Sequence, residues 1–138
     1  MKKQKGFTLI ELLVVIAIIG LLSTLAVVAL NNARQKARDA RRVSDIKQIQ
    51  TALELYYNDE NGYPAAAAED GALTGATSGI TYMTIIPANP SPGGATYTYT
   101  QGGNPATEAS YTLTYDLEGP VGGLLAGSHT ATPAGIDN

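Results

Sequence analysis

The sequence has no cysteine and no tryptophan, and it has one histidine, His129. Without cysteine the chain can form no disulfide, no thiolate nucleophile and no zinc–thiolate site. The histidine follows Ser128, but neighbouring side chains on an extended chain point apart, and no paired base supports nucleophilic catalysis. We therefore interpret His129 as a surface residue and expect a protein that is not an enzyme.

Helix-breaking residues are scarce in the first half of the chain. No proline precedes Pro64, and Gly20 is the only glycine between residues 7 and 61. One continuous helix over residues 7–61 is therefore predicted. Asn61-Gly62 predicts its end, with glycine in the left-handed conformation that satisfies the last carbonyls. Acidic and amide groups just before this point oppose the helix dipole, so we expect the last turn to fray.

Positive charge is absent from the second half of the chain. No lysine or arginine follows Lys47, whereas nine of the twelve acidic residues do. This region offers nothing to contact phosphates, so direct nucleic-acid binding is not expected. The basic cluster between Arg34 and Lys47 is expected to meet lipid headgroups or acidic faces of neighbouring molecules instead.

What is present is a long apolar run in which Glu11 is the only charged residue from Phe7 to Leu30. At 1.5 Å per residue this run forms a helix of about 36 Å, long enough to cross a bilayer. A carboxylate inside hydrocarbon costs roughly 2.5–3.5 kcal/mol. Glu11 therefore either extends to the headgroups or finds a cationic partner, and its spacing from Phe7 leaves both interpretations open.

Three lysines precede the run, and Gly6 separates them from it. A secretory signal also has a basic start, and Val27-Val28-Ala29 would provide its cleavage site, but its apolar region is usually about 7–15 residues long. This run is longer, and Glu11 interrupts it. The sequence Lys5-Gly6-Phe7-Thr8-Leu9-Ile10-Glu11 instead resembles the leader of a type IV prepilin. The resemblance is close to about Leu22 and extends to the rest of the chain only in layout.

The resemblance implies a processing and assembly pathway. Prepilin peptidase would cut between Gly6 and Phe7, the new Phe7 amine would be N-methylated, and the Phe7 ammonium of a neighbouring subunit would pair with Glu11. The precursor would lie in the bacterial cytoplasmic (inner) membrane as a single-pass protein. Inner-membrane pilus assembly machinery would then build it into a homopolymer at the cell surface or outside the cell.

After residue 62, turn signals separate segments that alternate in polarity. Residues 96–100 and 111–118 have the period of two that is typical of half-buried strands, and residues 80–86 are a third candidate strand. Residues 62–138 are too few to bury a large core alone. We expect them to pack on an apolar helical stripe, whose members recur every three or four residues: Val43, Ile46, Ile49, Leu53 and Tyr56 or Tyr57.

These elements predict an α+β fold, with one long N-terminal helix packed on a small antiparallel sheet, which resembles the pilin fold. Residues 1–6 would be the leader and residues 7–61 the helix, of which 7–30 would lie in the membrane or the filament core. Residues 62–138 would form a β-rich region outside the cytoplasm.

Acidic residues near the C-terminus raise the question of a metal. Oxygen ligands suit calcium, and a resemblance to the major pseudopilins of type II secretion implies a calcium site near the C-terminal loops. The candidates are Asp116, Glu118 and Asp137. No spaced ligand motif joins them, so the alternative is that they solvate the outer surface, and no other cofactor is expected.

The expected function is that of a structural subunit, a pilin, of a type IV pilus or pilus-like filament that polymerises through its apolar helix. One alternative is a major pseudopilin of a type II secretion system. A second is a membrane-tethered binding domain that does not polymerise.

Overall fold

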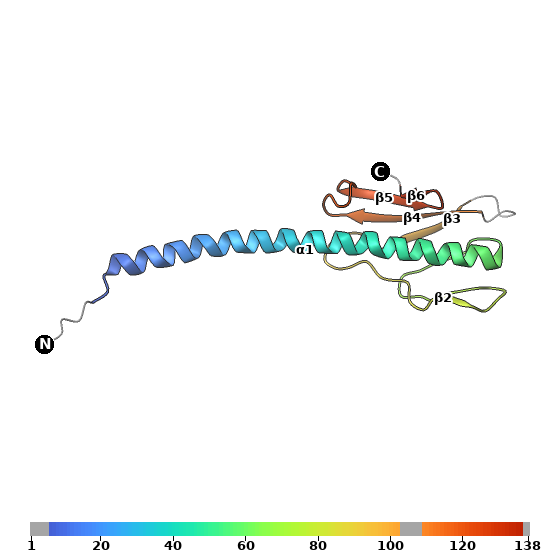
Figure 1. Ribbon diagram of the computed structural model, residues 1–138, viewed down its shortest axis with the longest axis horizontal. Coiled ribbons are helices and arrows are strands. Elements are labelled where there is room, and N and C mark those ends of the chain that lie inside the picture. The colour runs from blue at the N-terminus through green and yellow to red at the C-terminus, as the bar shows by residue number, and fades with distance from the viewer. Residues whose placement is uncertain (1–5, 103–108, 137–138) are drawn as a thin grey trace. The chain divides into compact units, whose positions relative to one another are not determined.

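The computed structural model describes residues 6–102 and 109–136 (Figure 1). It divides into two compact units, Met1–Arg34 and Gln35–Asn138. The elements are the helix α1 (Leu9–Glu60) and the strands β1 (Leu73–Thr74), β2 (Thr81–Met83), β3 (Thr98–Gly102), β4 (Ser110–Leu117), β5 (Gly127–Thr132) and β6 (Gly135–Ile136). The second unit therefore contains the C-terminal half of the helix together with all the described strands.

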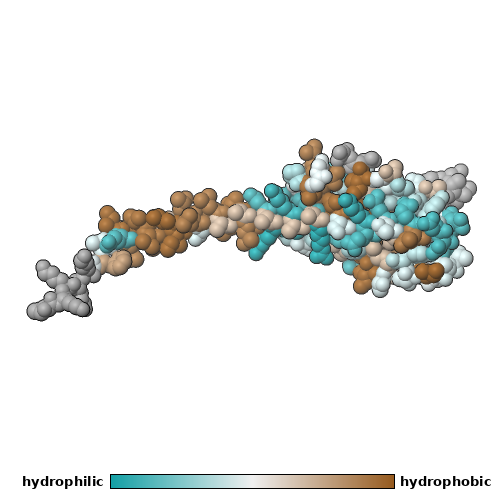
Figure 2. Space-filling model, viewed as in Figure 1, coloured by the Kyte–Doolittle hydropathy of each residue, from teal (hydrophilic) through white to brown (hydrophobic). Residues whose placement is uncertain are grey.

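In the first unit, the helix presents its apolar side chains outward. Leu9, Leu21 and Val28 are 77%, 63% and 59% exposed, and Figure 2 shows this part of the helix in brown. The hydroxyl groups of Ser23 and Thr24 donate to the carbonyls of Ile19 and Leu21, so they add little polarity to the surface. By length and composition, this helix can cross a membrane.

The helix ends as predicted near Asn61, but with a different residue at the turn. Asn61, not Gly62, has the left-handed conformation, with φ of 59°, and its N–H donates to the Tyr57 carbonyl. Asparagine tolerates this region better than most residues do. At the last turn, the Glu60 carboxylate accepts hydrogen bonds from the backbone N–H groups of Thr77 and Ser78. These bonds oppose the expected fraying, which stays a prediction.

The strands form two antiparallel sheets. The larger has the order β3-β4-β5-β6, and β1 pairs with β2 in the smaller. The three predicted strands are β3, β4 and β2, each displaced or shortened by a few residues. Strands β5 and β6 were not predicted, since the sequence of β5 is poor in β-branched apolar and aromatic residues and its structure depends on pairing with β4.

The core lies between the helical stripe and the larger sheet, which confirms the predicted α+β fold. Ile46, Ile49, Leu53 and Tyr56 of the helix are buried. Alternate residues of β4 are also buried, beginning at Tyr111 and ending at Leu117. Tyrosine rings link helix and sheet, because Tyr63 packs 4.7 Å from Tyr57 and 4.8 Å from Tyr111 between ring centroids. These tyrosines are therefore core residues.

Candidate functional site

The predicted cleavage site lies in the non-helical segment before α1. Gly6 is exposed, and Phe7 is 87% exposed. A Cβ atom placed on Gly6 would meet no heavy atom within 4 Å. The chain's own structure therefore does not require glycine here, so a requirement for glycine would come from a molecule that approaches the Gly6–Phe7 bond.

Glu11 lies in the first turn of the helix and forms a capping box with Thr8. Its Oε2 accepts hydrogen bonds from the Thr8 backbone N–H at 2.8 Å and from the Thr8 hydroxyl at 2.6 Å. In return, the Glu11 backbone N–H donates to Thr8 Oγ1 at 3.3 Å. This exchange satisfies backbone donors that have no partner within the helix.

This role of Glu11 was not predicted, although Thr8-x-x-Glu11 before an apolar run is the signal for a capping box. The cap is compatible with a second, intermolecular partner. Both bonds from Thr8 reach the same oxygen, and the Glu11 side chain is exposed. A cation from another molecule can therefore reach the carboxylate without breaking the cap.

The comparisons with known proteins bear on this N-terminal segment. Residues 1–27 match the family model "Prokaryotic N-terminal methylation motif". The chain carries a prepilin-type N-terminal motif. This confirms the resemblance inferred from Lys5 to Leu22, and it places Gly6, Phe7 and Glu11 within the matched segment.

Relatives of this chain include both secretion and fimbrial proteins. It is 44% identical over 63 residues to a type II secretion system core protein G of Pectobacterium carotovorum subsp. carotovorum, covering 46% of this chain and 40% of the relative. It is 34% identical over 92 residues to that of Vibrio cholerae, covering 67% and 56%. It is also 44% identical over 54 residues to a fimbrial protein of Pseudomonas aeruginosa, covering 39% and 35%.

These matches are partial. The chain spans about half the length of the curated relatives it matches, from 40% to 56% of the two core G proteins described above. No solved structure matches the chain.

In the second unit, a cluster of charges surrounds the buried Arg42. Arg42 and Asp39 are 0% and 1% exposed, and Arg42 Nη1 donates to Asp39 Oδ1 and to Glu118 Oε1, each at 2.6 Å. Arg38 binds both oxygens of Glu118 through its Nε and Nη2. Two guanidinium groups and two carboxylates thus balance one another within the domain.

This cluster joins the helix to the end of β4. The Asp39 carboxylate also accepts hydrogen bonds from the backbone N–H groups of Glu118 and Gly119, at 3.0 and 2.9 Å. The expectation that Arg38 and Arg42 meet headgroups or neighbouring molecules was therefore wrong. The interpretation of Glu118 as a solvated surface acid was also wrong, because both of its oxygens are bonded to arginine.

The other two calcium candidates are Asp116 and Asp137. Asp116 accepts a hydrogen bond from the Ala95 backbone N–H, and Asp137 lies outside the described residues. Across residues 6–102 and 109–136, no group of three or more His, Cys, Asp or Glu side chains is placed to hold a metal. Calcium at these positions remains a prediction, and arginine already occupies both oxygens of Glu118.

His129 is buried rather than on the surface, with 6% exposure. It lies on β5 opposite Tyr115 of β4, and the two rings are 5.7 Å apart between centroids. One of its ring nitrogens, Nε2, lies 2.8 Å from the Leu125 carbonyl. The surface interpretation failed because strand β5 itself was not predicted.

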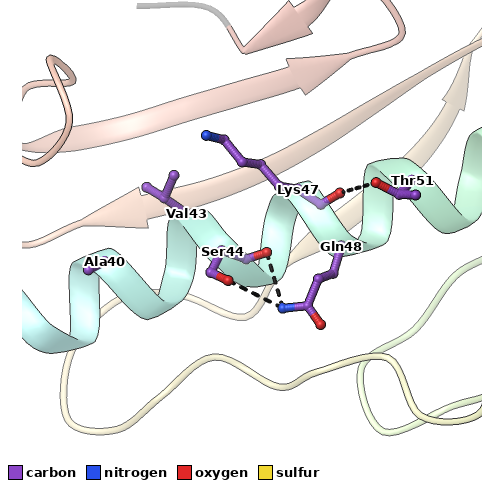
Figure 3. Close-up of a pocket in the computed structure, with 6 residues that line it drawn as sticks. All are labelled: Ala40, Val43, Ser44, Lys47, Gln48 and Thr51. Carbon is purple, nitrogen blue, oxygen red and sulfur yellow. Dashed lines mark hydrogen bonds between the residues drawn. The ribbon is translucent and has the colours of Figure 1, made fainter.

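A shallow groove of about 410 Å³ follows one side of α1 in the second unit (Figure 3). It is lined by Ala40, Val43, Ser44, Lys47, Gln48 and Thr51. Gln48 and Thr51 form hydrogen bonds within the helix: Gln48 Nε2 donates to the Ser44 carbonyl and hydroxyl, and Thr51 donates to the Lys47 carbonyl. With Lys47 as its only titratable side chain, the lining lacks an acid–base pair for catalysis.

The Glu118 contacts predict a stability that depends on pH. The hydrogen bonds from Arg38, which have the largest effect, and the one from Arg42 lower the pKa of the Glu118 carboxyl from 4.5 to about 2. A lowered folded-state pKa adds stability above the unfolded-state pKa, and this stability is lost as the pH falls through the folded-state value. The contribution of Glu118 is therefore complete above about pH 5 and declines toward pH 2.

Thermal unfolding of the parent and of Glu118→Gln at several pH values measures this contribution of Glu118 to stability. The free energy of unfolding of the variant is expected to be lower than that of the parent by about 1–3 kcal/mol at pH 7. This gap between the two proteins should narrow between pH 5 and pH 2. Asp70→Asn, which changes an exposed carboxyl, is the matched control and should keep the parent's free energy of unfolding at pH 7. A gap that stays constant down to pH 2 would contradict the assignment.

Proposed function

We propose that this chain is a structural subunit of a pilus-like filament, made as a membrane-anchored precursor and not as an enzyme. The observation that carries the proposal is the methylation motif over residues 1–27, together with the helix that begins within it at Leu9 and exposes its apolar side chains. Such a surface is stable only in lipid or against other apolar surfaces. The same helix can therefore serve as an anchor before assembly and as a packing surface after it.

The proposed assembly step transfers this helix from lipid to a bundle of helices from other subunits. Lipid is as apolar as leucine, so moving the helix out of lipid gains little hydrophobic free energy. The favourable free energy of association must therefore come from close packing and from pairing of polar groups. The Glu11 carboxylate is energetically unfavourable in hydrocarbon, and it gains an ionic partner when the Phe7 ammonium of a neighbouring subunit reaches it. This pairing would favour polymerisation and fix the axial register of the subunits.

The proposed partners follow from the same pathway. A prepilin peptidase would remove residues 1–6, and inner-membrane assembly machinery would add the processed chain to a homopolymer. The proposed localisation is the inner membrane for the precursor and the cell surface for the filament. These proposals are supported by the N-terminal motif and by the names of the secretion and fimbrial relatives.

A second candidate function is that of a major pseudopilin of type II secretion, because the Pectobacterium and Vibrio relatives are core G proteins of that system. Deleting the gene and examining cells by electron microscopy, together with an assay of secreted proteins, separates the candidates. Loss of long surface fibres supports a pilus, whereas loss of secretion without loss of fibres supports a pseudopilin. If the deletion affects neither the fibres nor secretion, the result supports a membrane-tethered binding domain that does not polymerise.

Processing is tested directly at the N-terminus. Mature protein from the native host, or from a host with a prepilin peptidase, is expected to begin at Phe7 with a methylated amine. Intact-mass and N-terminal peptide measurements check this expectation. A mature chain that begins after Ala29 would instead support an ordinary secretory signal.

A further inference from the structure

The Arg42 guanidinium lies in a cage of oxygen atoms contributed by three separate segments. The carboxylates are Asp39 of the helix and Glu118 after β4, each 2.6 Å from Nη1. The loop after residue 88 supplies the other oxygens. Asn89 Oδ1 lies 2.7 Å from Nε, and the carbonyls of Pro90, Pro92 and Gly93 lie 3.0, 3.4 and 2.5 Å from Nη2.

The loop is shaped closely around this cation. Gly93 and Gly94 have φ of 90° and 79°. A Cβ atom on Gly94 would lie 3.3 Å from Arg42 Nη2, and one on Gly93 would lie 2.7 Å from the Glu118 carboxyl carbon. Only glycine fits both positions without strain. The side chain of Asn89 closes the loop by donating to the carbonyls of Gly93 and Ala95.

The oxygen set around Arg42 has the composition that a calcium ion prefers. Calcium takes carboxylate, amide and backbone carbonyl oxygens, typically six to eight of them. A guanidinium meets a similar need with a planar fork of five N–H donors. Here all three nitrogens of Arg42 donate to oxygen, with Nη1 binding both carboxylates. The side chain is 0% exposed, so the position is fully occupied.

We propose that Arg42 is a built-in cation that fixes the loop over residues 89–94 to the helix and to the end of β4, in place of a bound calcium ion. Folding of this domain is then independent of calcium. Truncating Arg42 would empty the cage while Arg38 still holds Glu118. The oxygens of Asp39, Asn89 and the loop carbonyls would then be open, and they would bind calcium. The proposal concerns the stability of the domain and does not rest on filament assembly.

The first test needs no variant. The thermal unfolding of the full chain in detergent, followed by near-ultraviolet circular dichroism of its tyrosines, is measured in EGTA and in millimolar CaCl₂. The two midpoints are expected to agree within about 1 °C. A midpoint that is several degrees lower in EGTA would overturn the proposal, because the native domain would then depend on calcium.

The second test uses Arg42→Ala in the same assay. Removing one side of a buried ion cluster is strongly destabilising, so the midpoint in EGTA should fall by at least about 10 °C. Millimolar CaCl₂ should restore at least half of that loss, and Tb³⁺ luminescence excited through tyrosine should be stronger than for the parent. Arg42→Lys keeps the charge with fewer donors, and should lose stability without responding to calcium.

Arg41→Ala is the matched control, because Arg41 is the adjacent arginine and its side chain is 66% exposed. Its pair with Asp45 is 3.7 Å long and mostly exposed on the Arg41 side, so Arg41→Ala should lower the midpoint far less than Arg42→Ala does and should not create a response to calcium. An Arg42→Ala chain that does not respond to CaCl₂, or that stays unfolded in it, would overturn the assignment of the cage as a cation site. The unfolding midpoint of the parent in EGTA would still test whether Arg42 stabilises the domain without calcium.

Discussion

The Glu11→Ala variant is expected to enter the membrane and lose its leader normally, yet to be almost absent from filaments. In the proposed fibre, the Phe7 ammonium of a neighbour lies against Glu11 in an apolar surrounding. Removing the carboxylate leaves that ammonium buried without a partner, which typically costs about 3–5 kcal/mol. Incorporation should therefore fall by at least about 100-fold, as measured by immunoblots of sheared filaments against membrane fractions.

The capping box requires two controls, because Glu11→Ala also removes a hydrogen-bond partner of Thr8. Glu11→Gln can keep the cap but has no charge, since glutamine also serves at this position of a capping box. Thr8→Ala removes the hydroxyl and keeps the carboxylate. We expect Glu11→Gln to fail in assembly and Thr8→Ala to assemble.

The opposite pattern would assign Glu11 to helix capping and not to pairing between subunits. If Glu11→Ala itself assembled as well as the parent, with the same axial rise per subunit, the pairing hypothesis would be wrong. The interpretation that Glu11 only extends toward the headgroups would then stand.

The Gly6→Val variant is expected to accumulate as uncleaved precursor and to form no filaments. Valine is branched at Cβ and would crowd the Gly6–Phe7 peptide bond against an approaching peptidase. The structure leaves open space at Gly6, so the substitution should not disturb the fold of the chain. Intact mass of the membrane-bound protein and electron microscopy of the cells measure the two effects.

Gly6→Ala is the graded control, because a single methyl group should slow cleavage far less than the side chain of valine does. Normal processing and normal filaments from Gly6→Val would show that the glycine is incidental. Precursor that is unstable or missing from the membrane would instead indicate a defect in insertion.

The sequence alone predicted the features that depend on local pattern. The absence of proline and the scarcity of glycine predicted a long helix, which is observed over Leu9–Glu60. Spacings of three and four residues identified Ile46, Ile49 and Leu53 as its core-facing side, and alternation identified β4. The N-terminal motif was recognisable because its residues are consecutive, and even the missed cap was encoded locally, in Thr8-x-x-Glu11.

Only the tertiary structure decided the partners of the charged and polar groups. Glu118 meets Arg38 across 80 positions of sequence, and no local pattern specifies such a pair. The pairing of β5 with β4 buries His129, although the sequence of β5 gives little indication of a strand. Helical and strand periodicity identifies the side of an element that is buried, because it reflects contacts a few residues apart. Which charge meets which depends on sheet register and on the path of the loops, and these are fixed only when the helix and sheet pack together.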